Sequence, residues 1–463
     1  MPYQKGSNLP GERASKIGHL EVIQSPLVKK LCENFQDPDS TIAPLVSANW
    51  NTLPEPGEEL KIIFSADGSL QPIEKRQPPH KAIAFVKTAL LKIDQYAISK
   101  LSKNNPNPFA IRDMMKDSAL FHSTAFPLRH VCIPGKNIYN AVREIIFESV
   151  KDNGLNGALG GEMMETLKWI AYEKWDPQPR DYLEEFGCPH CDKPGEASAT
   201  LAYDQEKGLC PKCGKEIFLT DMFGLHLTMQ DDFAPNQVAS DYMEISVTLM
   251  IFTPIRYFWE NNKEVLKKCL LIKDGPLSLR ATLAKLAAPI RRFFKYAKEQ
   301  GVEVVMIGQE KTGAFADHLQ LIGTSAPEGS IFIPNNAYIR SEIQHNNSTG
   351  IYGWDTNYGA KVFIKYGNHQ KMVISIPTGE RGEGVENPSI NKLIGIHKII
   401  ATLPKILSNR YEGALLPIEL ANGIASLSTY PSAKVLDLFS QSVSSSKNRR
   451  GTRRVKKAIR SKS

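Results

Sequence analysis

Apolar runs and helical stripes alternate along this chain. The predicted strands share an apolar run bounded by turn residues, and they lie at 62–64, 70–74, 82–91, 269–273, 302–307, 330–334 and 360–377. The predicted helices share apolar positions three and four residues apart, and they lie at about 25–35, 142–150, 163–171, 241–268, 277–300, 390–407 and 418–427. We expect 70–74 to return beside 62–64 as a hairpin, and 82–91 to pass from strand into helix. Strands that alternate with helices predict an α/β core with a sheet flanked by helices.

The same pattern divides the chain into segments of different character. Helical patches, prolines and paired cysteines set residues 95–235 apart, and we interpret them as an insertion. The predicted parts are residues 1–94 (first helix and strands of the core), 95–235 (the insertion, with a cysteine-rich unit at 188–213), 236–440 (the rest of the core) and 441–463 (a basic tail). A length of 463 residues suits such an organisation.

Composition and charge narrow the class of protein. Hydrophobic residues make up 41% and charged residues 23%, as in ordinary globular proteins. No apolar run approaches the roughly 18–20 residues that span a bilayer, so we expect a cytoplasmic protein without a membrane partner. The net charge is +8, but residues 447–463 alone carry nine Lys/Arg and no acid, which leaves about −1 for the rest. That tail is either a solvated end or a segment that attracts phosphates without sequence preference.

Two Asp-Gly pairs carry the candidate chemistry. Asp67-Gly68 follows the apolar run 62–64, and Asp274-Gly275 follows the run 269–273. A carboxylate at the end of a buried strand is costly unless it is paired or binds a cation. Two such strands could bring Asp67 and Asp274 together as oxygen ligands for Mg²⁺ or Mn²⁺. The competing interpretation is that each pair is only a surface turn.

Two further residues could complete this site. Glu244 begins the helical stretch that leads to the second Asp-Gly, although an acid at a helix start is often only solvated. Lys311 follows the strand predicted at 302–307, where a lysine could hold a phosphate, although an isolated lysine is most often an ordinary surface residue.

Four of the seven cysteines form two C-x₂-C pairs. Cys188 and Cys191 are separated from Cys210 and Cys213 by eighteen residues, a spacing typical of a zinc ribbon. Gly214 suits the turn after the second pair. Four thiolates leave no open position for water, so the predicted Zn²⁺ is structural.

The order of these motifs resembles the NurA family of nucleases. The similar segments are 14–28, the Phe-Ser-Ala-Asp-Gly-Ser at 64–69, the Leu-Leu-Ile-Lys-Asp-Gly-Pro-Leu at 270–277, the strand ending in Lys-Thr at 301–312, and the Leu-Pro-Ile-Glu-Leu-Ala-Asn-Gly-Ile-Ala at 416–425. The insertion and the basic tail lie outside the resemblance. The closing motif of the family often ends in His, whereas this chain has Asn422, with Glu419 and Tyr411 as nearby polar candidates.

The resemblance implies an RNase H-like core and an Mn²⁺- or Mg²⁺-dependent deoxyribonuclease, acting as an endonuclease, an exonuclease or both. It further implies a homodimer that works on DNA with a HerA-like hexameric ATPase, in DNA repair or antiviral defence. By position, Asp67, Asp274 and Glu244 would hold two cations, with Glu260 competing for the third place, and Lys311 would lie beside the phosphate. The chain itself has no G-x-x-x-x-G-K-[ST] loop, so ATP-driven movement would come from the partner.

Two other hypotheses remain open from the residues. The chain could be a non-catalytic subunit that binds DNA and loads a motor onto it. Alternatively, it could be a zinc-ribbon interaction protein whose Asp-Gly pairs are only turns.

Overall fold

The computed structural model describes twelve stretches of the chain. They are residues 22–35, 48–75, 78–96, 119–131, 133–152, 163–191, 198–230, 233–346, 348–367, 370–408, 410–427 and 432–440. The basic tail at 441–463 and most of segment 14–28 therefore lie outside the described residues. The chain forms two compact units, Met1–Ala48 and Asn49–Ser463. In the first, the predicted helix is α2 (Pro26–Glu33), which begins where the Ser25 side chain accepts a hydrogen bond from Val28 N.

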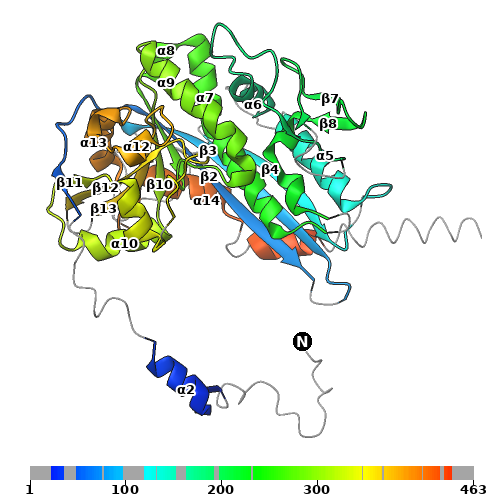
Figure 1. Cartoon of the computed structure of the whole chain (residues 1–463), viewed down its shortest axis with the longest axis horizontal. Coiled ribbons are helices and arrows are strands. Elements are labelled where there is room, and N and C mark those ends of the chain that lie inside the picture. The colour runs from blue at the N-terminus through cyan, green and yellow to red at the C-terminus, as the bar shows by residue number, and fades with distance from the viewer. Residues whose placement is uncertain are drawn as a thin grey trace, which may run out of the picture. The chain divides into compact units, whose positions relative to one another are not determined.

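The second unit is built on a nine-stranded mixed sheet (Figure 1). The strand order is β1-β11-β12-β13-β10-β9-β2-β3-β4. The strands are β1 (Asn51–Thr52), β2 (Ile62–Glu74), β3 (Ala82–Asp94), β4 (Ala119–Arg129), β9 (Cys269–Asp274), β10 (Val305–Glu310), β11 (Ser330–Phe332), β12 (Ala360–Gly367) and β13 (Gln370–Ile376). Strand β9 runs parallel to both β2 and β10, and the other neighbouring pairs are antiparallel. The predicted α/β class with a large mixed sheet is confirmed.

Helices cover both faces of this sheet (Figure 1). The larger core lies under α5 (Ile138–Lys151), α6 (Met163–Ala171), α7 (Asn236–Asn261), α8 (Lys263–Leu266) and α9 (Ala287–Glu299). The second core lies under α13 (Ile396–Ile406) and α14 (Leu416–Ala425). Within β9, Leu271 belongs to the first core and Leu270 and Ile272 to the second, as alternation along a strand requires. The remaining helices are α10 (Ala314–Gly323), α11 (Asn336–Tyr338) and α12 (Glu383–Glu386).

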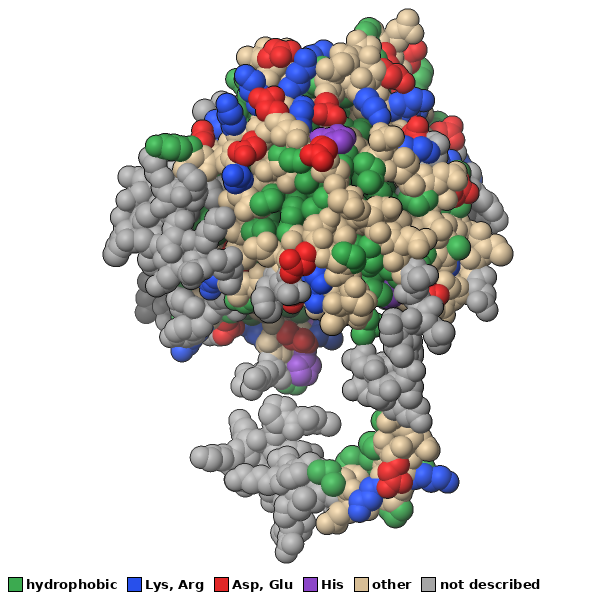
Figure 2. All heavy atoms as spheres, turned by 90° about the vertical axis from the view of Figure 1, so that its left-hand side faces the viewer, with side chains coloured by type: hydrophobic (Ala, Val, Ile, Leu, Met, Phe, Trp, Pro, Cys, Tyr) green, Lys and Arg blue, Asp and Glu red, His purple; other side chains and the backbone are tan. Residues whose placement is uncertain are grey.

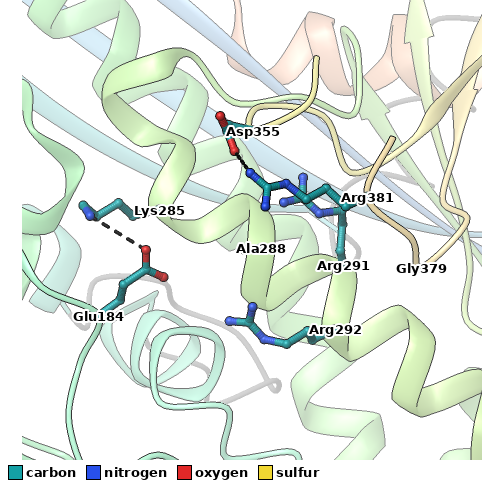
Figure 3. A pocket seen from close by; sticks show the side chains of 8 residues that line it. All are labelled: Glu184, Lys285, Ala288, Arg291, Arg292, Asp355, Gly379 and Arg381. Carbon is teal, nitrogen blue, oxygen red and sulfur yellow. Dashed lines mark hydrogen bonds and ion pairs between the residues drawn. The ribbon is translucent and has the colours of Figure 1, made fainter. Parts of the chain in front are cut away.

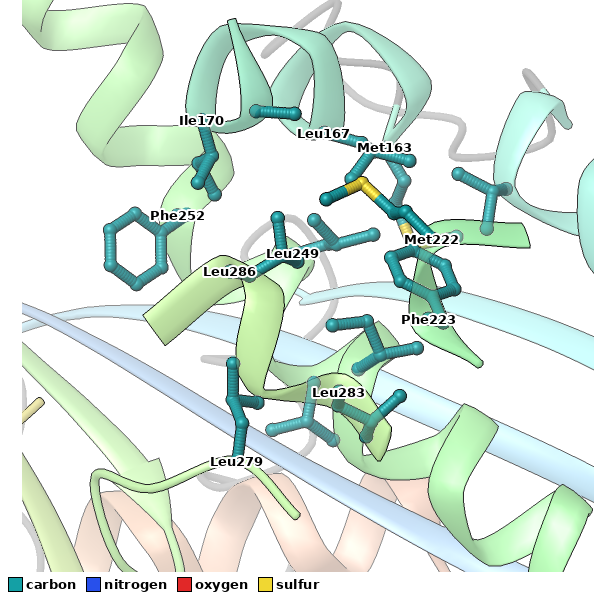
Figure 4. Close-up of a cluster of buried hydrophobic side chains, with 14 of the residues drawn as sticks. Met163, Leu167, Ile170, Met222, Phe223, Leu249, Phe252, Leu279, Leu283 and Leu286 are labelled. Atoms are coloured by element: carbon teal, nitrogen blue, oxygen red, sulfur yellow. The ribbon is translucent and has the colours of Figure 1, made fainter. Parts of the chain in front are cut away.

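The larger core joins segments that are far apart in the chain. Figure 4 shows Leu167 of α6 and Leu249 of α7 close to Leu283 and Leu286, which lie on the 3₁₀ helix η4 (Ala281–Leu286). The helix predicted at 277–300 therefore begins as η4 and continues as α9. Strand β4 pairs with β3, and α5 and α6 pack into this core. Within the predicted insertion, the described strand β4 and helices α5 and α6 thus pack onto the main sheet and into its larger core.

The prediction of a turn at Asp67-Gly68 is wrong. Strand β2 continues through both residues to Glu74, and it pairs with β3 from Ile62 opposite Asp94 to Glu74 opposite Ala82. The hairpin expected within 62–74 and the helix expected after 82–91 are therefore both replaced by one long pair of strands. A Cβ at Gly68 would lie 2.6 Å from Met243 Cγ, so the glycine makes room for α7 rather than for a turn.

The surface gives two further observations. Within the described residues, none of the helices has both the length and the apolar character needed to cross a bilayer. Figure 2 shows the face on the β11 side of the molecule, where acidic and basic side chains are interspersed around apolar ones. Among the described residues of that face, charge of a single sign does not gather.

Candidate functional site

Asp67 and Asp274 lie on neighbouring parallel strands. Ala66 of β2 stands opposite Lys273 of β9, so the next residue on each strand is an aspartate. Ile272, two positions before Asp274, belongs to the core under α13 and α14. Because side chains alternate along a strand, both aspartates are directed to the face that α14 covers. The structure thus brings together the two carboxylates that the sequence paired.

Asp67 is almost fully buried, with 2% of its surface exposed. Its Oδ1 accepts a hydrogen bond from Gly68 N at 2.6 Å, whereas its Oδ2 has no partner among the described residues. Burial, followed by the charge of Asp274, raises the pKa of Asp67 to about 6, against the lowering effects of Asn422 and Lys311. A buried carboxylate with a free oxygen next to a second carboxylate is a favourable place for a cation.

Lys311 reaches the aspartate pair from the next strand. It follows directly after β10, which lies beside β9, and its Nζ is 2.7 Å from Asp274 Oδ1. Both side chains are about one-third exposed, at 35% and 32%. Gly275, with φ +82°, turns the chain after Asp274, so here the Asp-Gly turn is as predicted. Asp67, Asp274 and Lys311 therefore form one cluster, in which Asp67 is buried and Asp274 and Lys311 are one-third exposed.

Glu244 is not brought into this cluster. It lies on α7, over the opposite face of the sheet, with its Oε2 3.3 Å from Arg280 Nε. Burial raises the pKa of Glu244, while the charges of Lys273 and Arg280 lower it. Glu260, the other candidate, lies near the end of α7, 45% exposed and 3.6 Å from Arg256. Both acids predicted as the third metal ligand thus lie on the side of the sheet opposite to the Asp67 carboxylate.

Lys273 is a buried residue that the sequence analysis passed over. It is 3% exposed, and its Nζ donates a hydrogen bond to Pro276 O at 3.0 Å. Burial lowers the pKa of Lys273, whereas carboxylates on both faces, first Glu244 and then Asp274, raise it. The lysine thus balances charge between the two faces and holds the turn after Asp274. The sequence does carry a signal for this role, because Lys273 stands at the end of the apolar run 269–272. A strand covered on both faces rarely admits an unpaired charge, so a lysine there indicates a buried and compensated cation.

Helix α14 supplies the polar groups on the aspartate face. The side chain of Asn422 lies near Asp67 and lowers the pKa of that carboxyl group. Glu419, one turn earlier, has both carboxylate oxygens buried and without a partner among the described residues. Its place in the first turn of the helix favours a negative charge. Tyr411, by contrast, is 64% exposed. Glu419 is therefore the acid with free buried oxygens that α14 adds to this face.

These oxygen atoms suit a hard divalent cation. Across the described ranges, the only three or more His, Cys, Asp or Glu side chains with ligand atoms mutually within 4.8 Å are the four cysteines. The aspartate cluster therefore has two adjacent carboxylates and no tight set of three. The free oxygens of Asp67 and Glu419 are nevertheless of the type that Mg²⁺ and Mn²⁺ prefer. The donor chemistry fits the predicted cation.

The four cysteines lie together and could hold a metal ion. The Sγ atoms of Cys188 and Cys213 are 3.8 Å apart, and those of Cys191 and Cys210 are 3.9 Å apart. Four thiolates in a tetrahedron at about 2.3 Å from Zn²⁺ would have Sγ atoms about 3.8 Å apart. Short strands lead into the pairs: β5 (Phe186–Gly187) pairs with β6 (Ser198–Ala199), and β7 (Lys207–Leu209) with β8 (Glu216–Phe218).

Comparisons with known proteins add little to this geometry. No protein-family model matches the chain, and no curated protein matches it. Among solved structures, the chain matches the NurA nuclease from Sulfolobus solfataricus with 11% sequence identity and a TM-score of 0.31, over 93% of this chain and 95% of that one. A TM-score this low does not show that the two chains share a fold.

Proposed function

We propose that this protein is a divalent-cation-dependent deoxyribonuclease. The observation that carries the proposal is the buried, half-satisfied carboxylate of Asp67 beside Asp274, with Lys311 ion-paired to the latter. Two adjacent carboxylates can hold a divalent cation and a nearby lysine can stabilise charge on a phosphate, and both contributions promote phosphodiester hydrolysis. The ordered motifs that resemble NurA nucleases favour DNA as the substrate.

In this proposal each residue has a defined task. Asp67 and Asp274 hold the cation, with Glu419 as the additional carboxylate in place of Glu244. A bound Mn²⁺ or Mg²⁺ supplies charge stabilisation at the phosphate and a more acidic water molecule. Asn422 lies near Asp67 and favours its charged form, and Lys273 fixes the turn that presents Asp274. Lys311, one-third exposed, can exchange its contact with Asp274 for a contact with the scissile phosphate.

The strand order supports the RNase H-like core of this proposal. Strands β2, β3 and β4 form an antiparallel meander, and β9 and β10 extend the sheet parallel to β2. That arrangement is the one expected of an RNase H-like sheet, with the paired acids on its first and fourth strands. We further propose structural Zn²⁺ at the four cysteines, a homodimer, and a HerA-like hexameric ATPase that delivers DNA.

A second function is favoured by one residue. Asn422 stands where the similar family often has His. An incomplete site would make the chain a non-catalytic subunit that binds DNA for a motor. In that case replacing Asp67 or Asp274 would leave DNA degradation by the complex unchanged.

The two functions are separated by a DNA degradation assay. Linear and circular DNA are incubated with the full chain and Mn²⁺, with and without a co-expressed ATPase of the HerA type. Wild type should degrade DNA, and Asp67→Ala and Asp274→Ala should lower the rate by at least about a hundredfold. Glu260→Gln, a matched loss of an acid on the far face, should retain activity. Degradation that Asp67→Ala leaves unchanged would refute the nuclease assignment.

A further inference from the structure

A basic pocket lies on the α7 and α9 side of the sheet. It has a volume of about 460 Å³ and is lined by four cationic side chains, Lys285, Arg291, Arg292 and Arg381, against two acidic ones, Glu184 and Asp355. Lys285 comes from η4, and the two consecutive arginines come from α9. Figure 3 shows the guanidinium groups of Arg291 and Arg381 side by side at the upper end of this pocket.

Arg291 is the unusual member of this group. It is 5% exposed, and its Nη1 donates a hydrogen bond to the backbone oxygen of Asn357 at 2.6 Å. Within the described part of the chain Arg291 forms no ion pair, and Asp355 of the same pocket is ion-paired to Arg381 instead. Burial and the charge of Arg381 lower the pKa of Arg291, the charge of Asp355 opposes them, and Arg292 lowers that pKa further. A guanidinium nevertheless stays charged in proteins. A buried positive charge without a carboxylate partner is costly, and an anion in the pocket would remove that cost.

The other cations are only partly neutralised. Arg292 contacts Glu173 at 2.6 Å, but the same oxygen is 2.7 Å from Arg180 Nε. Lys285 Nζ is 3.8 Å from Glu184 Oε1, a loose contact between half-exposed groups. The pocket therefore keeps an excess of positive charge after its internal ion pairs are formed.

The pocket is also held in shape by the backbone. A Cβ at Gly379 would lie 2.9 Å from Lys295 N on α9, so only glycine allows the loop that carries Arg381 to approach this closely. The segment that carries Asp355 continues into Tyr358, whose N donates to Leu277 O at 2.9 Å. Leu277 lies three residues after Asp274, so the backbone that supports this side of the pocket is continuous with the turn after Asp274.

We propose that this pocket binds a phosphate group, supplied by the backbone of a nucleic acid. Several guanidinium groups around one cavity provide the planar, forked donors that match phosphate oxygens. The nucleic acid source rests on the proposed function; free phosphate or a small phosphorylated molecule is the other source of the same chemistry.

The test compares DNA binding by full-length variants that cannot cleave. In an Asp67→Asn background without added divalent cation, fluorescence anisotropy with labelled DNA is measured for Arg291→Met and Arg381→Gln. Arg129→Gln is the matched control, because Arg129 is a partly exposed arginine paired with an acid, Glu74, outside the pocket. Each pocket variant should raise Kd about tenfold and reduce the slope of log Kd against log salt by about one, while the control changes Kd less than about twofold.

A second measurement separates the two sources of phosphate. Thermal unfolding of wild type is recorded with and without inorganic phosphate. Unchanged DNA binding, together with a phosphate-induced stabilisation that Arg291→Met abolishes, would assign the pocket to a small phosphorylated molecule. No effect of either pocket variant on DNA or phosphate would overturn the proposal. The result is independent of cleavage, because loss of phosphate binding in these variants supports the pocket even if wild type does not degrade DNA.

Discussion

Replacing Asp67 by asparagine should stabilise the protein at neutral pH while it abolishes cleavage. The carboxylate is buried, its Oδ2 lacks a partner among the described residues, and its pKa is raised from 3.8 to about 6 by burial and Asp274. Roughly two pH units at 1.36 kcal/mol each correspond to about 3 kcal/mol of unfavourable ionisation in the folded state. Asparagine keeps the acceptor for Gly68 N and removes the charge. A gain of about 2–3 kcal/mol corresponds to roughly 2–3 °C in the unfolding temperature of a chain this long.

The sign of the pH dependence follows from the direction of the shift. A carboxyl group with a raised pKa in the folded state is most favourable to folding below its unfolded pKa of 3.8, and that stability is lost as pH rises through about 6. The advantage of Asp67→Asn should therefore be near zero at pH about 4 and reach its full size above pH about 7. The assay is thermal unfolding across this range without added divalent cation. Asp94→Asn, at an exposed carboxylate on β3, is the matched control.

Two outcomes would refute this reasoning. A destabilisation of Asp67→Asn that is equal at pH 5 and pH 7.5 would mean that the carboxylate makes a favourable contact in the folded protein. Stabilisation of wild type and variant by Mn²⁺ to the same extent would also contradict the account. A cation held by Asp67 should add about 1.4 kcal/mol to wild type alone when its free concentration is about ten times Kd.

The remaining predictions concern the lysines and the cysteines. Lys311→Met should lower the initial rate of DNA cleavage about 10²- to 10³-fold with little change in unfolding temperature, since the lysine is partly exposed; a rate within twofold of wild type would exclude it from the chemistry. Lys273→Met should destabilise the fold by about 3–5 kcal/mol, because it leaves Glu244 and neighbouring carboxylates buried without their cation; an unchanged denaturation midpoint would contradict that charge balance. Cys188→Ser should reduce the zinc content measured by native mass spectrometry from one ion per chain toward none, and an ion retained at full occupancy would argue against the four-thiolate site.

How much of this could be predicted from the sequence depends on whether a feature is local. The strand 269–273, the glycine turn after Asp274 and the helix 163–171 follow from patterns within a few residues, and the structure has them. Gly68 was misread as a turn residue because its role is to admit α7, a helix some 170 residues later in the chain. Glu244 was assigned to the aspartates because sequence order does not reveal which face of the sheet a helix will cover. The buried charge of Lys273 and the free oxygens of Glu419 likewise depend on packing from both sides.

The central claim is that Asp67 and Asp274 together hold a divalent cation. Mn²⁺ binding to the full chain, followed by electron paramagnetic resonance, tests it without any assumption about the substrate. Wild type and Glu244→Gln should bind Mn²⁺ with similar affinity, whereas Asp67→Asn should lose about tenfold or more in affinity. Equal stoichiometry and affinity in wild type and Asp67→Asn would contradict the account.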